Sequence, residues 1–142
     1  MNLDKLTEDE LKDLILQKQL EWIKLCQDDF LIFAGAMWED FIYRKTKDPK
    51  KYGHHQIIGE AFQDIADGDA KRLIINMPPR HTKSEFASYL FPAWFIGKYP
   101  KKKIMQVSHN AELASRFGSK VRNLMNTPEY KQIFGNVTLR ED

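Results

Sequence analysis

Hydrophobic residues recur every three or four positions along the first part of the chain, a spacing typical of helices that bury one face. Thr7, followed three residues later by Glu10, has the form of a capping box and predicts where the first helix begins. This helix should run to about Gln27, because helical spacing relates Leu11, Leu14, Ile15, Lys18, Trp22 and Leu25. A second apolar stretch, over residues 30–43, predicts a more deeply buried helix.

A polar segment over residues 45–53, with Asp48, Pro49 and several lysines, predicts a loop. It divides the chain into an N-terminal helical segment, residues 1–50, and a second unit, residues 51–142. The second unit opens with helical spacing over residues 54–65 and a turn at residues 67–69.

Beyond that turn, residues 72–77 form a continuous apolar run that predicts a buried parallel strand, ended by the Pro78–Pro79 pair. A second strand is expected over residues 103–108, where the run again precedes a helical pattern.

A mostly apolar helix should begin near Lys83, with a kink or break at Pro92, and another helix should cover residues 111–125. The order strand, helix, strand, helix predicts an α/β fold with a parallel sheet flanked by helices.

Composition narrows the class of protein. The 142 residues are 42% hydrophobic and 30% charged, which excludes intrinsic disorder as the main state. The longest apolar runs fall short of the roughly 20 residues that cross a bilayer, and no secretory signal is evident, so the cytosol is expected. A single cysteine, Cys26, excludes an internal disulfide and argues against a zinc site.

Charge is distributed unevenly. Residues 1–70 hold 9 Lys/Arg against 15 Asp/Glu, whereas residues 71–142 hold 13 against 5. The basic half favours an anionic ligand or nucleic acid, although a solvated lysine face gives the same count.

The junction after the first predicted strand reads Met-Pro-Pro-Arg-His-Thr-Lys-Ser over residues 77–84. Lys83 followed by Ser84 at a helix start is the working end of a phosphate-binding loop: the lysine neutralises phosphate charge and the hydroxyl binds Mg²⁺. Met77 and Thr82 stand where such loops normally carry glycine, so Thr82 implies either a loop shape that a β-branched residue can adopt or strain. The alternative is a Pro-Pro turn that merely precedes a surface helix.

Residues 72–84 together with 88–94 resemble the large terminase subunit of tailed bacteriophages, the ATP-driven motor that packages viral DNA. In that family a PPRH-K-[ST] loop often replaces the glycine-rich form. Residues 52–58 are similar to the family's entry to the nucleotide site, and residues 103–124 to its second strand and helix. The resemblance covers about residues 30–140 and implies an incomplete P-loop NTPase core preceded by N-terminal helices.

The resemblance implies a role for each matching residue. Lys83 would contact the β and γ phosphates of ATP, Ser84 would bind Mg²⁺, and the backbone from Arg80 to Lys83 would wrap the phosphate chain. Arg80 would stabilise the γ-phosphate, or alternatively pair with an acidic neighbour. Gln56 would read adenine. His81 would touch phosphate or a neighbouring subunit, or else lie exposed.

The family also implies double-stranded DNA, other terminase subunits and the capsid portal as partners, a homo-oligomer in the intact motor, and the host cytoplasm. An acidic strand that orients the attacking water is not found in the sequence, nor are a nuclease domain's clustered aspartates. Weak nucleotide binding without turnover is therefore expected of these 142 residues. Two other hypotheses stay open: another P-loop NTPase such as a helicase, and a nucleic-acid or protein binding module without turnover.

Overall fold

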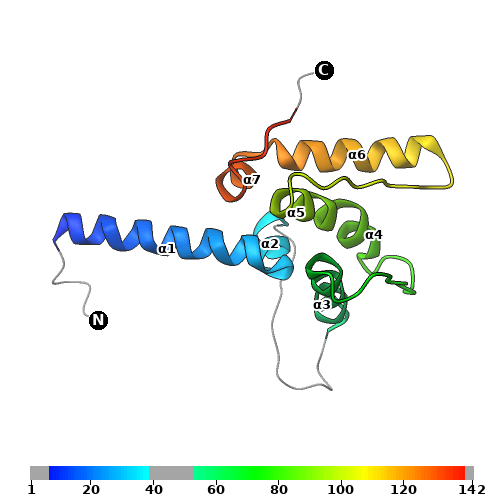
Figure 1. Cartoon of the computed structure of the whole chain (residues 1–142), viewed down its shortest axis with the longest axis horizontal. Helices are drawn as coiled ribbons and strands as arrows, with labels where there is room; N and C mark the ends of the chain where they lie inside the picture. The colour runs from blue at the N-terminus through cyan, green and yellow to red at the C-terminus, as the bar shows by residue number, and fades with distance from the viewer. Residues whose placement is uncertain (1–6, 39–52, 140–142) are drawn as a thin grey trace.

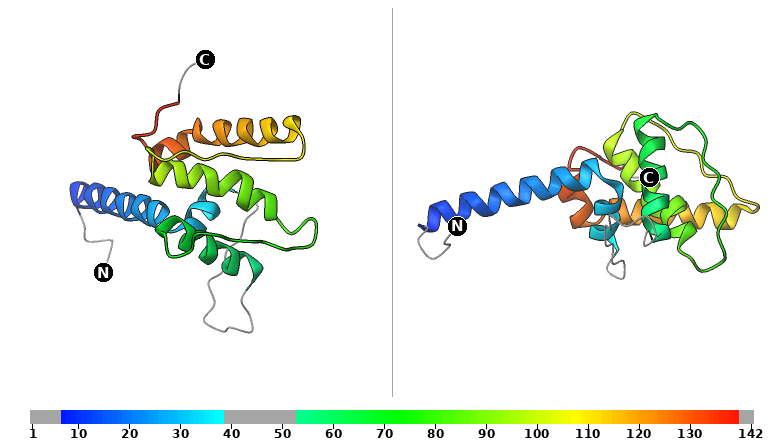
Figure 2. Two further views of the ribbon diagram at one scale, coloured as in Figure 1. Left: turned by 45° about the vertical axis from the view of Figure 1, so that its right-hand side comes forward. Right: turned by 90° about the horizontal axis from the view of Figure 1, so that it is seen from below.

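The computed structural model describes residues 7–38 and 53–139 of the chain. Helices follow one another in the order α1 (Glu8–Asp28), α2 (Phe30–Met37), α3 (His54–Asp67), α4 (Lys83–Glu85), η3 (Phe86–Leu90), α5 (Phe91–Lys98), α6 (Ala111–Met125) and α7 (Pro128–Ile133). They gather into one body from which α1 projects (Figure 1). Figure 2 shows the same projection from two further directions.

The predicted parallel sheet is wrong for the part of the chain that the structure describes. Residues 72–77 and 103–107 run as irregular chain between helices and form no strand. A strand exists only where its backbone groups pair with a neighbouring strand, and no backbone–backbone hydrogen bond joins either segment to another described residue. Ile74, Met105 and Val107 are accordingly 94%, 85% and 82% exposed. No sheet of a P-loop NTPase core is therefore present among these residues.

The two predicted helices at the N-terminus are confirmed, as is the capping box of the first. The Thr7 hydroxyl accepts from the Glu10 backbone N–H, and Glu10 reciprocates at the Thr7 backbone N–H, 2.8 Å away. Asp29 ends α1 and begins α2, where its Oδ1 accepts from the N–H groups of Leu31 and Ile32. The second predicted helix ends earlier than residue 43, since Trp38 is the C-cap of α2. The loop predicted over residues 45–53 lies outside the described residues, except for Gly53.

The last helix, α7, is one that the apolar pattern did not predict. Its signal was nevertheless in the sequence: Thr127 is the N-cap, its hydroxyl accepting from the Tyr130 N–H, and Pro128 takes the first helical position.

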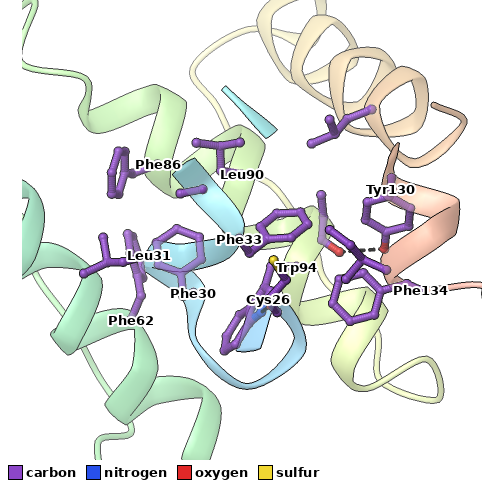
Figure 3. Close-up of a cluster of buried hydrophobic side chains, with 14 of the residues drawn as sticks. Cys26, Phe30, Leu31, Phe33, Phe62, Phe86, Leu90, Trp94, Tyr130 and Phe134 are labelled. Carbon is purple, nitrogen blue, oxygen red and sulfur yellow. Dashed lines mark hydrogen bonds between the residues drawn. The ribbon is translucent and has the colours of Figure 1, made fainter. Parts of the chain in front are cut away.

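Phe30 lies at the centre of the buried core (Figure 3). Its ring centroid is 5.6 Å from those of Phe62 in α3, Phe86 in η3 and both Phe91 and Trp94 in α5. Three of these contacts are edge-to-face, the arrangement favoured by the ring quadrupole. The N-terminal helices and the later helices consequently share one core.

Two buried aromatic side chains also satisfy backbone carbonyls. The Trp94 indole N–H donates to the Cys26 carbonyl at 3.0 Å, in the last turn of α1. The Tyr130 hydroxyl donates to the Ala93 carbonyl at 2.9 Å, which joins α7 to α5. Both bonds remove the cost of burying an unpaired polar group.

Of the kink or break expected at Pro92, the break does not occur, because helical structure continues from η3 into α5. The five residues before α5 form the π-helical turn η3, in which the Phe91 N–H donates to the Phe86 carbonyl. A proline at position 92 leaves the carbonyl four residues earlier, that of Ser88, without its helical donor. The Gln106 side-chain amide donates to this carbonyl at 2.8 Å. The helix from Lys83 to Lys98 therefore contains one irregular turn and is supported by an external hydrogen bond.

Replacing Gln106 by Leu should destabilise the protein by about 1–3 kcal/mol, because the Ser88 carbonyl loses the donor that replaces its helical one. In a Pro92→Ala background, Gln106→Leu should reduce stability by less, since the new alanine restores a backbone N–H that can donate to the Ser88 carbonyl. Urea unfolding of the four proteins of this double-mutant cycle measures the difference. Equal costs in both backgrounds would contradict the assignment.

Two glycines of the chain form a matched pair for a packing test. A Cβ added at Gly97 would lie 2.5 Å from the Phe134 ring, whereas one added at Gly118 meets nothing within 4 Å. We expect Gly97→Ala to destabilise by about 1–3 kcal/mol through overpacking. Gly118→Ala, inside α6, should stabilise by about 1 kcal/mol through helix propensity. Thermal unfolding measures both changes in stability. If the two substitutions changed stability in the same direction, Gly97 would not be a site of close packing.

Candidate functional site

The loop before α4 has an unusual backbone. Arg80 and Thr82 both have left-handed conformations, with φ of 65° and 63°. Such values cost a non-glycine residue about 1–2 kcal/mol. Of the two alternatives for Thr82, the left-handed backbone therefore agrees with strain and not with a loop shape that a β-branched residue readily adopts.

Side-chain contacts from α3 hold this loop. His55 Nε2 lies 2.8 Å from Thr82 Oγ1, and that hydroxyl donates to the His81 carbonyl at 2.6 Å. The His55 ring stacks on Phe86 with the two planes 10° apart and the centroids 5.2 Å apart. His55 thereby connects the loop to the aromatic core, a role that the sequence pattern did not reveal.

His81 folds back on its own loop. Its Nδ1 lies 2.9 Å from the Pro79 carbonyl, and its ring centroid is 5.8 Å from that of His54. The side chain remains exposed to solvent. In the described residues no group of three or more His, Cys, Asp or Glu side chains is arranged to hold a metal ion.

Two cationic side chains at this loop have no counter-ion among the residues that the structure describes. Arg80 and Lys83 are exposed, and neither forms a side-chain hydrogen bond or ion pair with another described residue. The first intrahelical bond runs from the Phe86 N–H to the Thr82 carbonyl at 3.0 Å. The N–H groups of residues 83–85 therefore precede the helical ladder and lie at the positive end of the helix dipole. Cations and free amide donors together form an environment that attracts phosphate.

A hollow of about 480 Å³ lies beside the helix start. Lys83, Ser84 and Ser88 contribute its polar lining, and the remainder is apolar: Phe62, Ile65, Leu73, Ile75, Ala87 and Phe91. The structure thus brings Lys83 and Ser84 to one hollow. Arg80, His81 and Thr82 lie in the adjoining loop and do not line it.

Gln56 takes no part in this hollow. Its side chain is buried and donates to Glu60 Oε1 at 2.9 Å within α3. Its predicted contact with adenine stays a prediction.

Ser84 fits one ligand position for Mg²⁺. Its hydroxyl is exposed at the helix start beside Lys83. The nearest carboxylate in sequence, Glu85, binds Lys120 Nζ at 2.7 Å. Mg²⁺ commonly keeps several waters and takes its other ligands from one or two carboxylates and from substrate phosphates, so Ser84 would supply one protein ligand only. The site's own residues therefore fit an ion that arrives with a nucleotide, not a resident metal.

No protein-family model matches this chain, and no curated protein or solved structure does so either. The described helices include none with the length and hydropathy needed to cross a membrane.

Burial lowers the pKa of His55 from its ordinary value of 6.5, and the nearby His54 lowers it further. The unfolded chain therefore binds a proton at a higher pH than the folded one does. The free energy of unfolding should fall as the pH drops below about 6.5, and His55→Gln should weaken this dependence. Urea unfolding between about pH 5 and pH 8 measures it, with the exposed His109→Gln as control. An unchanged pH dependence in His55→Gln would contradict the prediction.

Proposed function

We propose that the loop over residues 78–82 and the helix start at Lys83 bind the phosphate chain of ATP carrying Mg²⁺, as part of a motor that packages viral DNA. The observation that carries this proposal is the placement of Arg80 and Lys83, two exposed cations without a described counter-ion, beside the free N–H groups of residues 83–85. The resemblance of the loop sequence to large terminase subunits supports the choice of nucleotide and of motor.

Each group of the site has a defined task in this proposal. The Lys83 ammonium binds the terminal phosphates, and the amide N–H groups donate to the phosphate chain. Arg80 adds a second cation, and its planar guanidinium suits phosphate oxygens. Bound Mg²⁺ would neutralise part of the phosphate charge, with Ser84 as its protein ligand.

His55 is a positioning residue. Its bond to Thr82 and its stacking on Phe86 hold the left-handed backbone that aims the loop. Because the loop is held before a ligand arrives, less ordering entropy opposes binding.

The same proposal extends to partners and turnover. In the intact motor, the chain would act with double-stranded DNA, other terminase subunits and the capsid portal, as a homo-oligomer in the host cytoplasm. ATP hydrolysis also needs a group that orients water. None of the residues proposed here supplies one, so these 142 residues should bind ATP without steady turnover.

Binding of Mg-ATP by the 142-residue chain, measured by calorimetry, tests the proposal. Lys83→Ala should weaken binding by about 10- to 100-fold, the effect of one lost charge-assisted hydrogen bond. Lys102→Ala, which removes another exposed lysine from the turn after α5, is the control and should leave affinity unchanged.

Tripolyphosphate and adenosine separate phosphate recognition from base recognition. We expect tripolyphosphate to bind and to depend on Lys83, and adenosine alone to bind far more weakly. Absence of Mg-ATP binding, or equal loss in Lys83→Ala and Lys102→Ala, would refute a phosphate site at this loop. Steady hydrolysis that Lys83→Ala abolishes would instead refute the expected lack of turnover.

A further inference from the structure

Hydrogen bonds determine which ring nitrogen carries the proton in two histidines at the loop before α4. The Thr82 hydroxyl donates its single proton to the His81 carbonyl at 2.6 Å. His55 Nε2, which lies 2.8 Å from the same hydroxyl oxygen, is therefore the donor in their contact. His81 Nδ1 lies 2.9 Å from the Pro79 carbonyl, which can only accept, so this nitrogen also carries a proton. In the neutral His81 side chain, Nε2 is consequently the unprotonated nitrogen.

This Nε2 atom of His81 is free to take up a proton or to meet a ligand. The His81 side chain is exposed, and the bond from Nδ1 is the only hydrogen bond of its ring among the described residues. That bond anchors the imidazole to the backbone of the loop. His55 differs, because its Nε2 already binds Thr82, and burial and the nearby His54 lower its pKa. Among the two histidines with assigned protons, His81 is thus the one that can respond to an incoming anion.

The charged groups around His81 are cations or other histidines. Arg80 precedes it, Lys83 follows two residues later, and the His54 ring at the start of α3 has its centroid 5.8 Å away. No carboxylate of the described residues forms an ion pair with His81, and Glu85 is already paired with a lysine of α6. A proton on Nε2 adds positive charge to a loop that is already positive, which is unfavourable until an anion binds.

Proton uptake at His81 and phosphate binding are therefore coupled. An anion favours the protonated form of a neighbouring group, and by reciprocity the protonated form binds the anion more tightly. The imidazolium also offers an N–H donor at Nε2, where the neutral ring offers only an acceptor. Histidine is the side chain that changes charge between about pH 5 and pH 8, so the affinity for phosphate should increase as the pH falls through this range.

We propose that His81 is a proton-linked phosphate ligand, whose Nε2 takes up one proton as the phosphate chain binds and donates a hydrogen bond to a phosphate oxygen. This inference rests on the phosphate site proposed at Lys83, to which it adds a third cation and a dependence on pH. The proton comes from the solvent and returns to it when the phosphate chain leaves, so no covalent bond of the ligand changes.

Calorimetric titration of the 142-residue chain with tripolyphosphate, without Mg²⁺, at about pH 5.5 and about pH 8 tests the coupling. Phosphate itself titrates near pH 6, so variants are compared, because the contribution of the ligand is the same for each. The ratio of the two affinities should be about fivefold larger for the parent than for His81→Gln, the effect of one exposed charge. His109→Gln removes another exposed histidine, outside the loop, and should keep the ratio of the parent. Circular dichroism verifies that each protein is folded at both pH values.

Two further measurements separate a proton-linked cation from a structural role. His81→Lys carries its charge at both pH values, so it should bind more tightly than the parent at about pH 8 and show the small affinity ratio of His81→Gln. Titrations at about pH 6.5 in two buffers with different heats of ionisation count the protons taken up on binding. The parent should take up more protons than His81→Gln, whereas His54→Gln should resemble the parent.

Binding at about pH 8 distinguishes failure of this inference from failure of the phosphate site, because Lys83 keeps its charge there. Absence of binding to the parent at this pH would refute the site, and the inference with it. Binding with equal affinity ratios in the parent and His81→Gln would refute the inference alone. So would loss of binding at about pH 8 in His81→Gln, which would give His81 a structural role, or a change of ratio in His54→Gln only.

Discussion

The fold depends on the burial of the Phe30 ring among aromatic side chains from α3, η3 and α5. Without a sheet in the described residues, no backbone ladder ties distant segments together, so side-chain packing must do so. Edge-to-face contacts of this kind contribute about 0.5–1.5 kcal/mol each beyond the burial of their area. Because these contacts are directional, they determine the relative orientation of the helices as well as the stability of their packing.

The geometry of the candidate site depends on contacts with this core. Phe86 contacts Phe30 on one side and stacks on His55 on the other, and His55 in turn reaches Thr82. A continuous set of contacts therefore leads from the centre of the core to the loop. Residues with left-handed backbone persist only where their surroundings hold them, and this series of contacts provides that support for Thr82.

The helix that carries Lys83 and Ser84 lacks one backbone hydrogen bond, and the fold compensates for it. Pro92 removes one helical donor, the π-helical turn η3 adjusts the spacing, and Gln106 from a distant segment satisfies the Ser88 carbonyl. The helix start can thus remain aligned with the core through Phe86 and Trp94.

The amino-acid sequence by itself determined the local features of this protein. The caps of α1, the spacing of its apolar residues, the existence of α3 and α6, and the Lys83–Ser84 pair at a helix start all depend on neighbours within a few positions. The helices predicted over residues 30–43 and from Lys83 do bury Phe33 and Trp94, whereas Trp22, on the predicted apolar face of α1, is 38% exposed.

Only the tertiary structure decided the rest. Residues 72–77 have the composition of a strand, yet a strand requires pairing with a distant segment, and the described chain offers none. The role of His55, the burial of Gln56 against Glu60 and the bond from Gln106 to Ser88 likewise depend on how the helices pack. Local propensity acts over one or two turns of chain, whereas these features depend on which surfaces meet once the helices have packed.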